Sequence, residues 1–392
     1  PQPYCAQMCC YCGCHAFAAK RDEPLADYVV AMMREIEAVA TASSARQVRE
    51  IHWGGGTPNM LSPERFEALV SSLRSGFDLS GVERHAIELD PRLLTREQAT
   101  TFARCGVNRA SLGVQDLDPK VQAGIGREQP FEMVESATRM LREAGVSALS
   151  LDLMYGLPHQ TRASVEETAK RAASLKPARF SVFGYAHVPW FKTRQRLIDE
   201  AALPGTEMRF ELAETIRATL ECEGYVAIGY DHYAHPEDPI AIAARSRALG
   251  RNFQGFVEAE CDVLIGLGPS AISTLPQGYV QNEPEVGAWR KAVMDGRLAT
   301  KRGHALSNED RRRRALIMDL LCNFTVDLTA HKYETFSVEE IQALRTLERD
   351  GLVEISARRL TIPEAARPFA RVVAQVFDAY VGHGQARHSR AV

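Results

Sequence analysis

The stretch Glu50-Ile51-His52-Trp53-Gly54-Gly55-Gly56-Thr57-Pro58 joins a short apolar run to three consecutive glycines. A run of this kind that is bounded by glycine is typical of a strand ending in a tight loop. Ser62 and Pro63 then supply the residue types that begin a helix. The stretch therefore predicts a strand, a loop and a helix in succession. Because glycine has no side chain, we also expect the loop to leave backbone amides open to a ligand.

The same succession recurs from residue 24 to about residue 225. Further strands are expected at residues 86–89, 109–114, 148–154, 180–185 and 226–230. Strands separated by helices favour a parallel sheet, so the predicted fold is α/β, a barrel or part of one. Polar residues stand where these strands end, among them Glu88 and Asp90, Gln115 and Asp116, Asp152, and His187. In such barrels the strand ends share one mouth, where we expect the active site.

The pattern changes beyond about residue 300. Helices are expected to begin at Ser307 and Ser337, followed by a hairpin within residues 352–361 and a last helix over residues 363–380. This order is typical of a winged-helix domain, a type that often binds DNA. The arginines at 311–314 are more simply explained as the solvated face of an amphipathic helix.

Three domains are therefore predicted. Residues 1–225 form the barrel core, residues 226–300 complete the barrel on the substrate side, and residues 301–392 form a small, mostly helical, winged-helix-like C-terminal domain.

The composition is that of an ordinary globular protein. The 392 residues are 45% hydrophobic and 25% charged, with a formal net charge of -3. These values exclude a disordered chain and argue against nucleic acid as the main partner. No apolar run reaches the roughly 18 residues that a membrane helix needs, so a membrane protein is not expected.

Five of the nine cysteines lie within the first fourteen residues. Cys5, Cys9 and Cys12 follow the spacing Cys-x3-Cys-x2-Cys, and Cys14 comes directly after Gly13. Three thiolates on one loop can bind three irons of a 4Fe-4S cluster, which leaves the fourth iron without a protein ligand. A structural zinc is the rival interpretation, but zinc sites usually add a second cysteine pair nearby. Cys10 lies off the spacing and is interpreted as a bystander.

The other cysteines stand alone in the sequence, so they are expected to be buried apolar residues and not ligands. They are Cys105, Cys222, Cys261 and Cys322. A disulfide framework is not expected in a chain of this length, which favours a reducing compartment, the cytoplasm.

Taken together, these motifs resemble the radical S-adenosylmethionine (SAM) superfamily. Within it, the chain is similar over nearly its whole length to the oxygen-independent coproporphyrinogen III oxidase (dehydrogenase) family. The similarity rests on residues 12–14, 52–58, 111–116, 152–158, 251–255 and 267–273. It implies a (β/α)6-type partial barrel followed by the C-terminal domain.

The resemblance implies a specific reaction. A reduced 4Fe-4S cluster cleaves SAM to methionine and a 5'-deoxyadenosyl radical, which abstracts a hydrogen from the β-carbon of a substrate propionate. Loss of carbon dioxide and one electron then leaves a vinyl group. Two such steps convert coproporphyrinogen III to protoporphyrinogen IX in haem biosynthesis.

The resemblance also implies the site residues. Cys5, Cys9 and Cys12 would bind the cluster. Two SAM molecules would be held, one by Gly55, Glu88 and Ile272, and the other by Tyr11, Gly56, Thr57, Gln115, Arg127, Asp152 and Ala186.

Three further residues are candidates for binding the substrate, which carries four propionates and no positive charge. They are Arg251, Asn252 and Gln254, chosen for their residue types and the family string. Cys14, beside the cluster ligands, is a candidate catalytic residue as a hydrogen or electron partner of the substrate radical. The partners expected are coproporphyrinogen III and an electron donor, and the protein is expected to be a monomer that binds neither nucleic acid nor membrane.

One departure from the family concerns the start of the chain. The family has a strand, with a SAM-binding tyrosine, ahead of the first cysteine ligand, whereas only four residues precede Cys5. We therefore expect an N-terminal truncation that removes the first strand and leaves residues 50–53 as an exposed edge.

Two other functions remain as alternatives. One is a haem-binding chaperone on the radical SAM scaffold that lacks decarboxylase activity; the Cys14 position and residues 251–255 favour the enzyme over it. The other is a regulator with a structural zinc that acts through the C-terminal domain.

Overall fold

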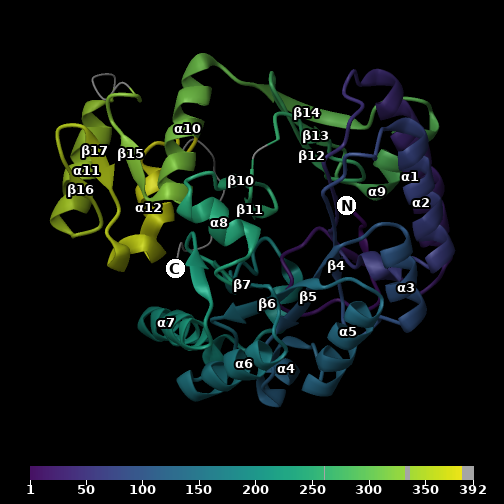
Figure 1. Ribbon diagram of the computed structural model, residues 1–392, viewed down its shortest axis with the longest axis horizontal. Coiled ribbons are helices and arrows are strands. Elements are labelled where there is room, and N and C mark those ends of the chain that lie inside the picture. The colour runs from purple at the N-terminus through teal and green to yellow at the C-terminus, as the bar shows by residue number, and fades with distance from the viewer. Residues whose placement is uncertain (260, 332–335, 382–392) are drawn as a thin grey trace.

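The centre of the molecule is a seven-stranded sheet (Figure 1). The structure is a computed structural model that describes residues 1–259, 261–331 and 336–381. The strands are β3 (Glu50–Trp53), β4 (Arg84–Leu89), β5 (Arg109–Gln115), β6 (Ala148–Tyr155), β7 (Arg179–Gly184), β8 (Val226–Ile228) and β9 (His232–Ala234), in the order β3-β4-β5-β6-β7-β9-β8. From β3 to β7 each strand runs parallel to the next, as predicted.

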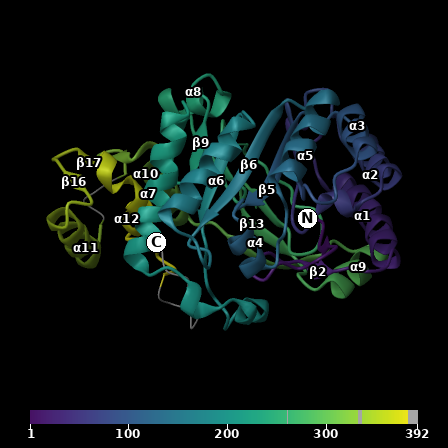
Figure 2. The same ribbon diagram turned by 90° about the horizontal axis from the view of Figure 1, so that it is seen from below.

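Helices lie along the outside of this sheet (Figure 2). They are α1 (Glu23–Ala42), α2 (Pro63–Gly76), α3 (Arg96–Arg104), α4 (Pro119–Ile125), α5 (Phe131–Glu143), α6 (Arg162–Ser174) and α7 (Thr206–Cys222). Local chemistry begins several of them, since Ser62 caps α2 and Thr95 forms a capping box with Gln98 at the start of α3. Within the described residues, none of the helices has the length and apolar character that crossing a membrane takes.

Alternation along β4, β5 and β6 decides which side chains enter the barrel. In each strand every second residue is buried in the apolar core beneath the helices, for example Ile87, Leu112 and Leu151. Successive side chains of a strand point to opposite faces, so the residues between these apolar ones face the interior of the barrel. Glu88 and Asp152 hold such positions. The sequence pattern therefore carries polar side chains to the inside without a break in the core.

The prediction of a last parallel strand at residues 226–230 is wrong in both direction and length. β8 ends at Ile228 and pairs antiparallel with β9, which pairs antiparallel with β7. The reason is the short connection after Ile228, where Gly229 adopts a positive φ of 60°. A turn of this length can join antiparallel strands, whereas a parallel crossover needs a dozen or more residues.

The start of the chain lies against the end of β3. The Gln2 amide donates to Gly54 O at 2.9 Å, and the Gly56 amide donates to Gln2 O at 2.6 Å. The Thr57 amide donates to Tyr4 O at 2.9 Å. β3 is the edge strand of the sheet, as expected of residues 50–53, and residues 2–4 bond to the loop just after it, at residues 54–57.

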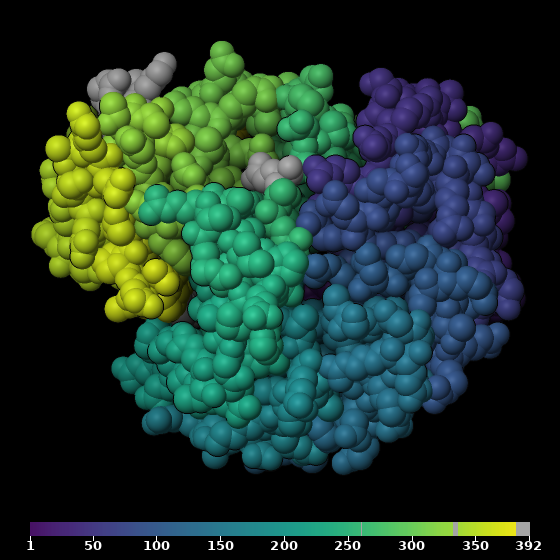
Figure 3. Space-filling model, viewed as in Figure 1, coloured from purple at the N-terminus to yellow at the C-terminus, as the bar shows by residue number. Residues whose placement is uncertain are grey.

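Residues 239–305 form small elements beside the sheet. They are α8 (Pro239–Arg245), a hairpin of β10 (Gly250–Asn252) and β11 (Gly255–Val257), a three-stranded sheet of β12 (Ile272–Leu275), β13 (Gly278–Asn282) and β14 (Thr300–Ala305), and α9 (Val286–Met294). In the space-filling view, teal and green atoms fill the centre between the C-terminal part in yellow and the N-terminal part in blue (Figure 3).

The C-terminal region has its own apolar core. It contains α10 (Asn308–Asn323), α11 (Val338–Arg349), α12 (Ala370–Gln375) and a sheet of β15 (Thr325–Asp327), β17 (Arg359–Thr361) and β16 (Glu354–Ile355). The predicted order of helices and hairpin is confirmed, but the prediction of one long last helix over residues 363–380 is wrong. Pro368 lies inside a short 3-10 helix, Glu364–Phe369, because proline lacks the amide that an α-helix needs there. The predicted domain boundaries, at residues 225 and 300, remain predictions.

Candidate cluster and substrate site

The cysteine loop connects two very short parallel strands, β1 (Tyr4–Cys5) and β2 (Phe17–Ala18). Its backbone is held at several points along the loop. The Cys10 amide donates to Ile125 O, at the end of α4, at 2.9 Å, and the Cys12 amide donates to Cys9 O at 3.4 Å. The loop is therefore fixed both to the glycine run after β3 and to α4. Cys10 packs in a small apolar cluster beneath the loop, as expected of a bystander.

Each of the three predicted ligands has a polar neighbour suited to a thiolate. Thr57 Oγ1 donates to the Cys5 sulfur at 3.2 Å. Burial raises the pKa of Cys5, and this hydrogen bond offsets part of the rise. The Cys14 amide donates to the Cys12 sulfur at 3.4 Å, and hydrogen bonding from Cys14 lowers the pKa of Cys12. A hydrogen bond to the charged form favours that form, so the loop is built to hold thiolates.

Two guanidinium groups lie against the third sulfur, that of buried Cys9. Arg127 Nη1 is 3.5 Å from it and Arg92 Nη2 is 3.8 Å from it. Asp90 pairs with both arginines, and Arg127 Nη2 also donates to Gly113 O at 2.7 Å. Arg127 Nε is buried and has no hydrogen-bond partner among the described residues. This orphaned donor, on a buried cation, fits an anionic group such as the carboxylate of SAM.

The donor set fits a cluster better than a single ion. In the part of the chain that the structure describes, no three His, Cys, Asp or Glu side chains converge closely enough to hold one metal ion. The ligands of a 4Fe-4S cluster bind different irons and so do not converge on one point. Three soft thiols on one loop, one of them beside two guanidinium groups, are a donor set that suits iron-sulfur chemistry, whereas a structural zinc usually takes four protein ligands.

Two carboxylates face the inside of the barrel near the loop. Glu88 accepts hydrogen bonds from His52 Nε2 at 2.9 Å and from the Gly55 amide at 3.2 Å. Burial alone would raise the pKa of Glu88, but the hydrogen bond and charge of His52, with the Gly55 amide, lower it. Burial raises the pKa of Asp152 to about 6, although Ser111 donates to its carboxylate at 2.9 Å. One site thus holds an ionised carboxylate beside one that titrates near neutral pH.

A cleft of about 1280 Å³ opens beside Glu88, between the barrel and the segments that follow residue 250. Its lining includes Gly55, Glu88, Ile272 and the predicted substrate residues Arg251, Asn252 and Gln254. The Arg251 guanidinium lies over the rings of Tyr230 and Phe256, at 5.8 and 5.7 Å from the ring centres, and its Nε has no partner among the described residues. A stacked arginine with a spare donor is suited to a carboxylate. The volume is sufficient for a large, polycarboxylate small molecule.

The structure separates the predicted cofactor residues into two groups. Gly55, Glu88 and Ile272 line the cleft together with the substrate candidates. The other predicted SAM residues do not line the cleft: Tyr11, Gly56, Thr57, Gln115, Arg127, Asp152 and Ala186. Gln115 has a positive φ of 67° at a register shift in β5, and its side chain turns toward Arg127, since both crowd Gly113. Cys14 is exposed beside the ligand loop.

The expectation of open amides at the glycine run is wrong. The amides of Gly55, Gly56 and Thr57 donate to Glu88, Gln2 and Tyr4. The glycines serve a closer approach instead, because a side chain at Gly56 would lie 2.6 Å from Tyr4 O, and one at Gly54 would lie 2.8 Å from the Glu88 carboxylate. These positions are glycine because a side chain there would collide with the N-terminal segment or with Glu88.

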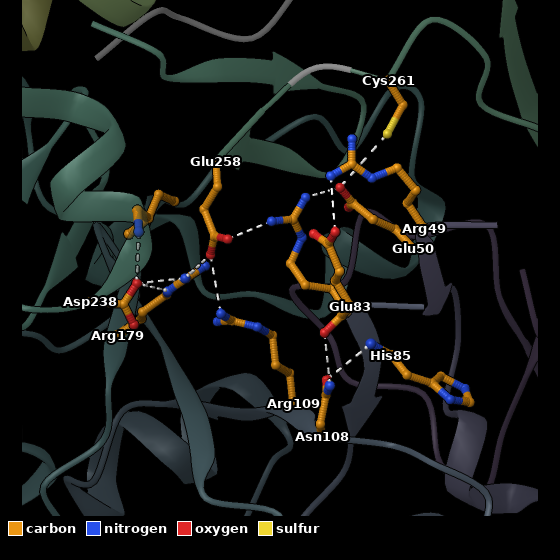
Figure 4. A network of polar contacts seen from close by, with 12 residues as sticks. Arg49, Glu50, Glu83, His85, Asn108, Arg109, Arg179, Asp238, Glu258 and Cys261 are labelled. Atoms are coloured by element: carbon orange, nitrogen blue, oxygen red, sulfur yellow. Dashed lines mark hydrogen bonds and ion pairs between the residues drawn. The ribbon is translucent and has the colours of Figure 1, made fainter. Parts of the chain in front are cut away.

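An ionic network holds the β10–β11 hairpin, which lines the cleft (Figure 4). Arg84, Arg109 and Arg179 are the first residues of β4, β5 and β7, and all three pair with Glu258, directly after β11. Arg109 Nη2 lies 3.1 Å from the Glu258 carboxylate. Asp238 accepts from Arg179 Nε at 2.9 Å. The network thus attaches the segment that carries Arg251 to the N-terminal ends of the parallel strands.

Some functional neighbours escape prediction from sequence. Arg92 and Glu258 are ordinary charged residues in the sequence, and only their partners give them a role; for Arg92, its position just after a predicted strand end was the available signal. The prediction that the four isolated cysteines are buried is right for Cys105 and Cys322 and wrong for Cys222 and Cys261, which are exposed. Cys222 is the last residue of α7, and Cys261 lies in a loop beside the cleft.

Comparisons with known proteins agree with this geometry. Residues 1–172 match the radical SAM superfamily, and residues 306–369 match the HemN C-terminal domain. The oxygen-independent coproporphyrinogen III oxidase of Bradyrhizobium diazoefficiens is 44% identical over 396 residues, which cover 100% of this chain and 88% of that protein. The protein of the same name from Paracoccus denitrificans is 38% identical over 383 residues, 96% of this chain and 85% of its own length.

A solved structure is similar over the same range. It is described as coproporphyrinogen III oxidase (HemN) from Escherichia coli, a radical SAM enzyme. The two structures superpose with a TM-score of 0.91 at 34% sequence identity, over 97% of this chain and 89% of the other. The radical SAM partial barrel is therefore confirmed.

Proposed function

The chain belongs to the family of oxygen-independent coproporphyrinogen III oxidases, which are radical SAM oxidoreductases, and from that membership we propose which of its residues carry the reaction. The reaction is the oxidative decarboxylation of two propionates of coproporphyrinogen III to vinyl groups, giving protoporphyrinogen IX in haem biosynthesis. One observation supports the assignment most. The Cys9 sulfur, in a loop with three cysteines at the cluster spacing, lies 3.5 Å from the buried guanidinium of Arg127, whose Nε has no partner among the described residues.

We assign the cluster to the loop. Cys5, Cys9 and Cys12 would hold the cluster. When bound, the cluster and SAM together supply the radical that removes a hydrogen from the substrate. Arg127 and Arg92 hold positive charge against Cys9, and Thr57 donates to Cys5, so the protein stabilises thiolate ligands.

We propose that two SAM molecules bind at the barrel mouth. Gly55, Glu88 and Ile272 contact the one nearer the cleft, where the ionised Glu88 accepts from an amino group. The second is held by Tyr11, Gly56, Thr57, Gln115, Arg127, Asp152 and Ala186. The orphaned Nε of Arg127 supports this role, because a carboxylate would satisfy it. Asp152 can accept from hydroxyl or amino groups there.

The substrate is placed in the cleft. Arg251, Asn252 and Gln254 receive its propionates, as the stacked and partly unsatisfied guanidinium of Arg251 suggests. Cys14, exposed beside the cluster loop, is proposed as the hydrogen or electron partner of the substrate radical. Coproporphyrinogen III and an electron donor are the partners. The relatives do not favour the haem-binding chaperone as an alternative.

We also propose that the protein works as a monomer in the cytoplasm, without nucleic acid or membrane as a partner. In the described part of the chain no cysteine forms a disulfide. An oxygen-sensitive cluster and cysteines outside disulfides both suit a reducing compartment.

Anaerobic reconstitution with iron and sulfide, followed by coproporphyrinogen III, SAM and titanium(III) citrate, tests the proposal. We expect carbon dioxide release and a divinyl product. The Cys9→Ala variant should retain only background iron and sulfide and give no product, while Cys10→Ala should keep both the cluster and turnover. SAM cleavage without carbon dioxide would refute the substrate, and a full cluster in Cys9→Ala would refute the ligand set.

A further inference from the structure

The segment of residues 186–199, which follows β7 and includes a short helix at Thr193–Leu197, exposes large apolar side chains. Trp190 is 49% exposed, Phe191 74% and Leu197 67%. Among the described residues, Phe191 is the most exposed of the large hydrophobic side chains. Aromatic side chains left in water on one short segment are typical of an interaction surface.

This segment is attached directly to the cysteine loop. Lys192 Nζ donates to Cys14 O at 3.2 Å, and Arg194 Nε donates to Met8 O at 3.1 Å. Buried Gln195 donates to Tyr11 O at 2.8 Å. The segment thus contacts the main chain on both sides of the ligands Cys9 and Cys12. A protein bound to its outer surface would lie next to the cluster loop.

The surface is also positively charged. Lys192, Arg194 and Arg196 fall within five residues, and within the described residues no acidic side chain forms an ion pair with any of them. Asp199, the nearest acidic residue in the segment, caps the following 3-10 helix by accepting from the Ala201 amide at 3.0 Å. Positive charges without acidic partners, placed around exposed aromatics, complement an acidic protein surface.

The surface lies apart from the substrate cleft. The residues that line the cleft include none between Glu88 and Arg251 in the sequence, so the segment of residues 186–199 does not contribute to the cleft. A partner on this segment would leave the cleft open. Reduction and substrate binding can therefore use separate faces of the same molecule.

We propose that residues 190–197 form the docking surface for the electron donor, an acidic protein that carries a one-electron centre. The proposal rests on the proposed function, because it requires a cluster in the adjacent loop. In the step concerned, the reduced donor loses one electron and the oxidised cluster gains it, with no bond made or broken. Arg194 and Arg196 steer the acidic donor, and Phe191 and Trp190 provide the apolar contact that holds it.

The test compares a protein reductant with a small one. An acidic flavodoxin in its hydroquinone form is the probe, titanium(III) citrate is the small reductant, and formation of 5'-deoxyadenosine is measured. We expect Arg196→Glu and Phe191→Ser to lower the rate at limiting flavodoxin about tenfold, and the rate with titanium(III) citrate to stay unchanged. The flavodoxin-driven rate should also fall as salt rises. Arg349→Glu, a charge reversal at the end of α11, is the matched control.

Direct binding gives a second readout that does not depend on turnover. Calorimetry of the flavodoxin with the reconstituted enzyme should show weaker binding for Arg196→Glu and Phe191→Ser, and unchanged binding for Arg349→Glu. Wild-type binding by both variants, or equal loss of rate with both reductants, would overturn the proposal. So would a change in oligomeric state on Phe191→Ser without a change in flavodoxin binding. Failure of the wild-type enzyme to decarboxylate with titanium(III) citrate would instead refute the proposed function.

Discussion

At the scale of single residues, Asp152 shows how the barrel changes the chemistry of a side chain. It lies on β6 between β5 and β7, and Ser181 is its neighbour in register on β7. Burial there raises its pKa from 3.8 to about 6, against the hydrogen bond from Ser111. The carboxylate is therefore held in a place that opposes its charge until a ligand satisfies it.

The first prediction follows from this raised pKa. Below pH 3.8 the carboxyl is protonated in both folded and unfolded states, so it carries no penalty. Above about pH 6 it is ionised in both states, and the folded state bears a penalty of about 3 kcal/mol. We expect Asp152→Asn to stabilise the SAM-free protein by up to that amount at pH 8, and not at pH 3.5, in urea unfolding. The same variant should weaken SAM binding. An equal change in stability at both pH values would contradict this account.

At the scale of elements, the β10–β11 hairpin depends on a contact outside itself. The hairpin places Arg251 in the cleft, and Glu258 follows directly after it. The first residues of three parallel strands hold Glu258 (Figure 4). Burial alone would raise the pKa of Glu258, but Arg179, Arg109 and Arg84 lower it. The N-terminal ends of these parallel strands thereby position a substrate-binding element.

The second prediction concerns Glu258→Gln. Removing one partner of a largely buried ion pair should lower the free energy of unfolding by about 3 kcal/mol. Because the pKa of Glu258 is lowered, this contribution is present above about pH 4.5 and is lost as the pH falls further. We also expect a higher KM for coproporphyrinogen III with little change in kcat, as for Arg251→Ala.

A matched control separates positioning from general stability. Glu83→Gln removes an exposed partner of Arg49 on the same edge, so its stability and KM should stay near wild type. If Glu258→Gln lost stability but kept the wild-type KM, Glu258 would be structural alone.

At the scale of the whole molecule, Glu35 joins segments far apart in the chain. This buried residue of α1 accepts from the Gly268 amide at 2.6 Å, from Asn282 Nδ2 at 2.7 Å and from Trp289 Nε1 at 3.1 Å. Burial raises its pKa, and these hydrogen bonds counteract the rise. One carboxylate thus fixes β13, α9 and the loop before β12 to the first helix, and so fixes one wall of the cleft to the barrel.

The third prediction is that Glu35→Ala lowers the free energy of unfolding by about 3 kcal/mol, because it removes the acceptor of three buried hydrogen bonds. Glu35→Gln, which keeps an acceptor oxygen, should cost less. Urea unfolding of both variants tests this, with Glu37→Ala as the control. Glu37 pairs with Arg34 on the exposed face of α1, and its loss should matter by no more than about 0.5 kcal/mol. A wild-type midpoint for Glu35→Ala would show that Glu35 does not join these segments.

Local patterns determined much of this protein without a structure. The alternation in residues 86–89, 109–114 and 148–154 identified strands, their buried side and the polar residues inside the barrel. The spacing of Cys5, Cys9 and Cys12 indicated cluster ligands. These features are readable because each depends on neighbours within a few residues, where strand and loop geometry is set by the side chains themselves.

Only the tertiary structure decided which distant residues meet. Arg127 is 118 positions from Cys9, and Lys192 is 178 positions from Cys14, yet both pairs are in contact. The antiparallel return of β8 and the bonding of residues 2–4 to the loop after β3 are of the same kind. Such meetings depend on the order and register of strands and on how loops close over them. A charged residue looks the same in sequence whether its partner is water, a helix turn or a thiol across the barrel.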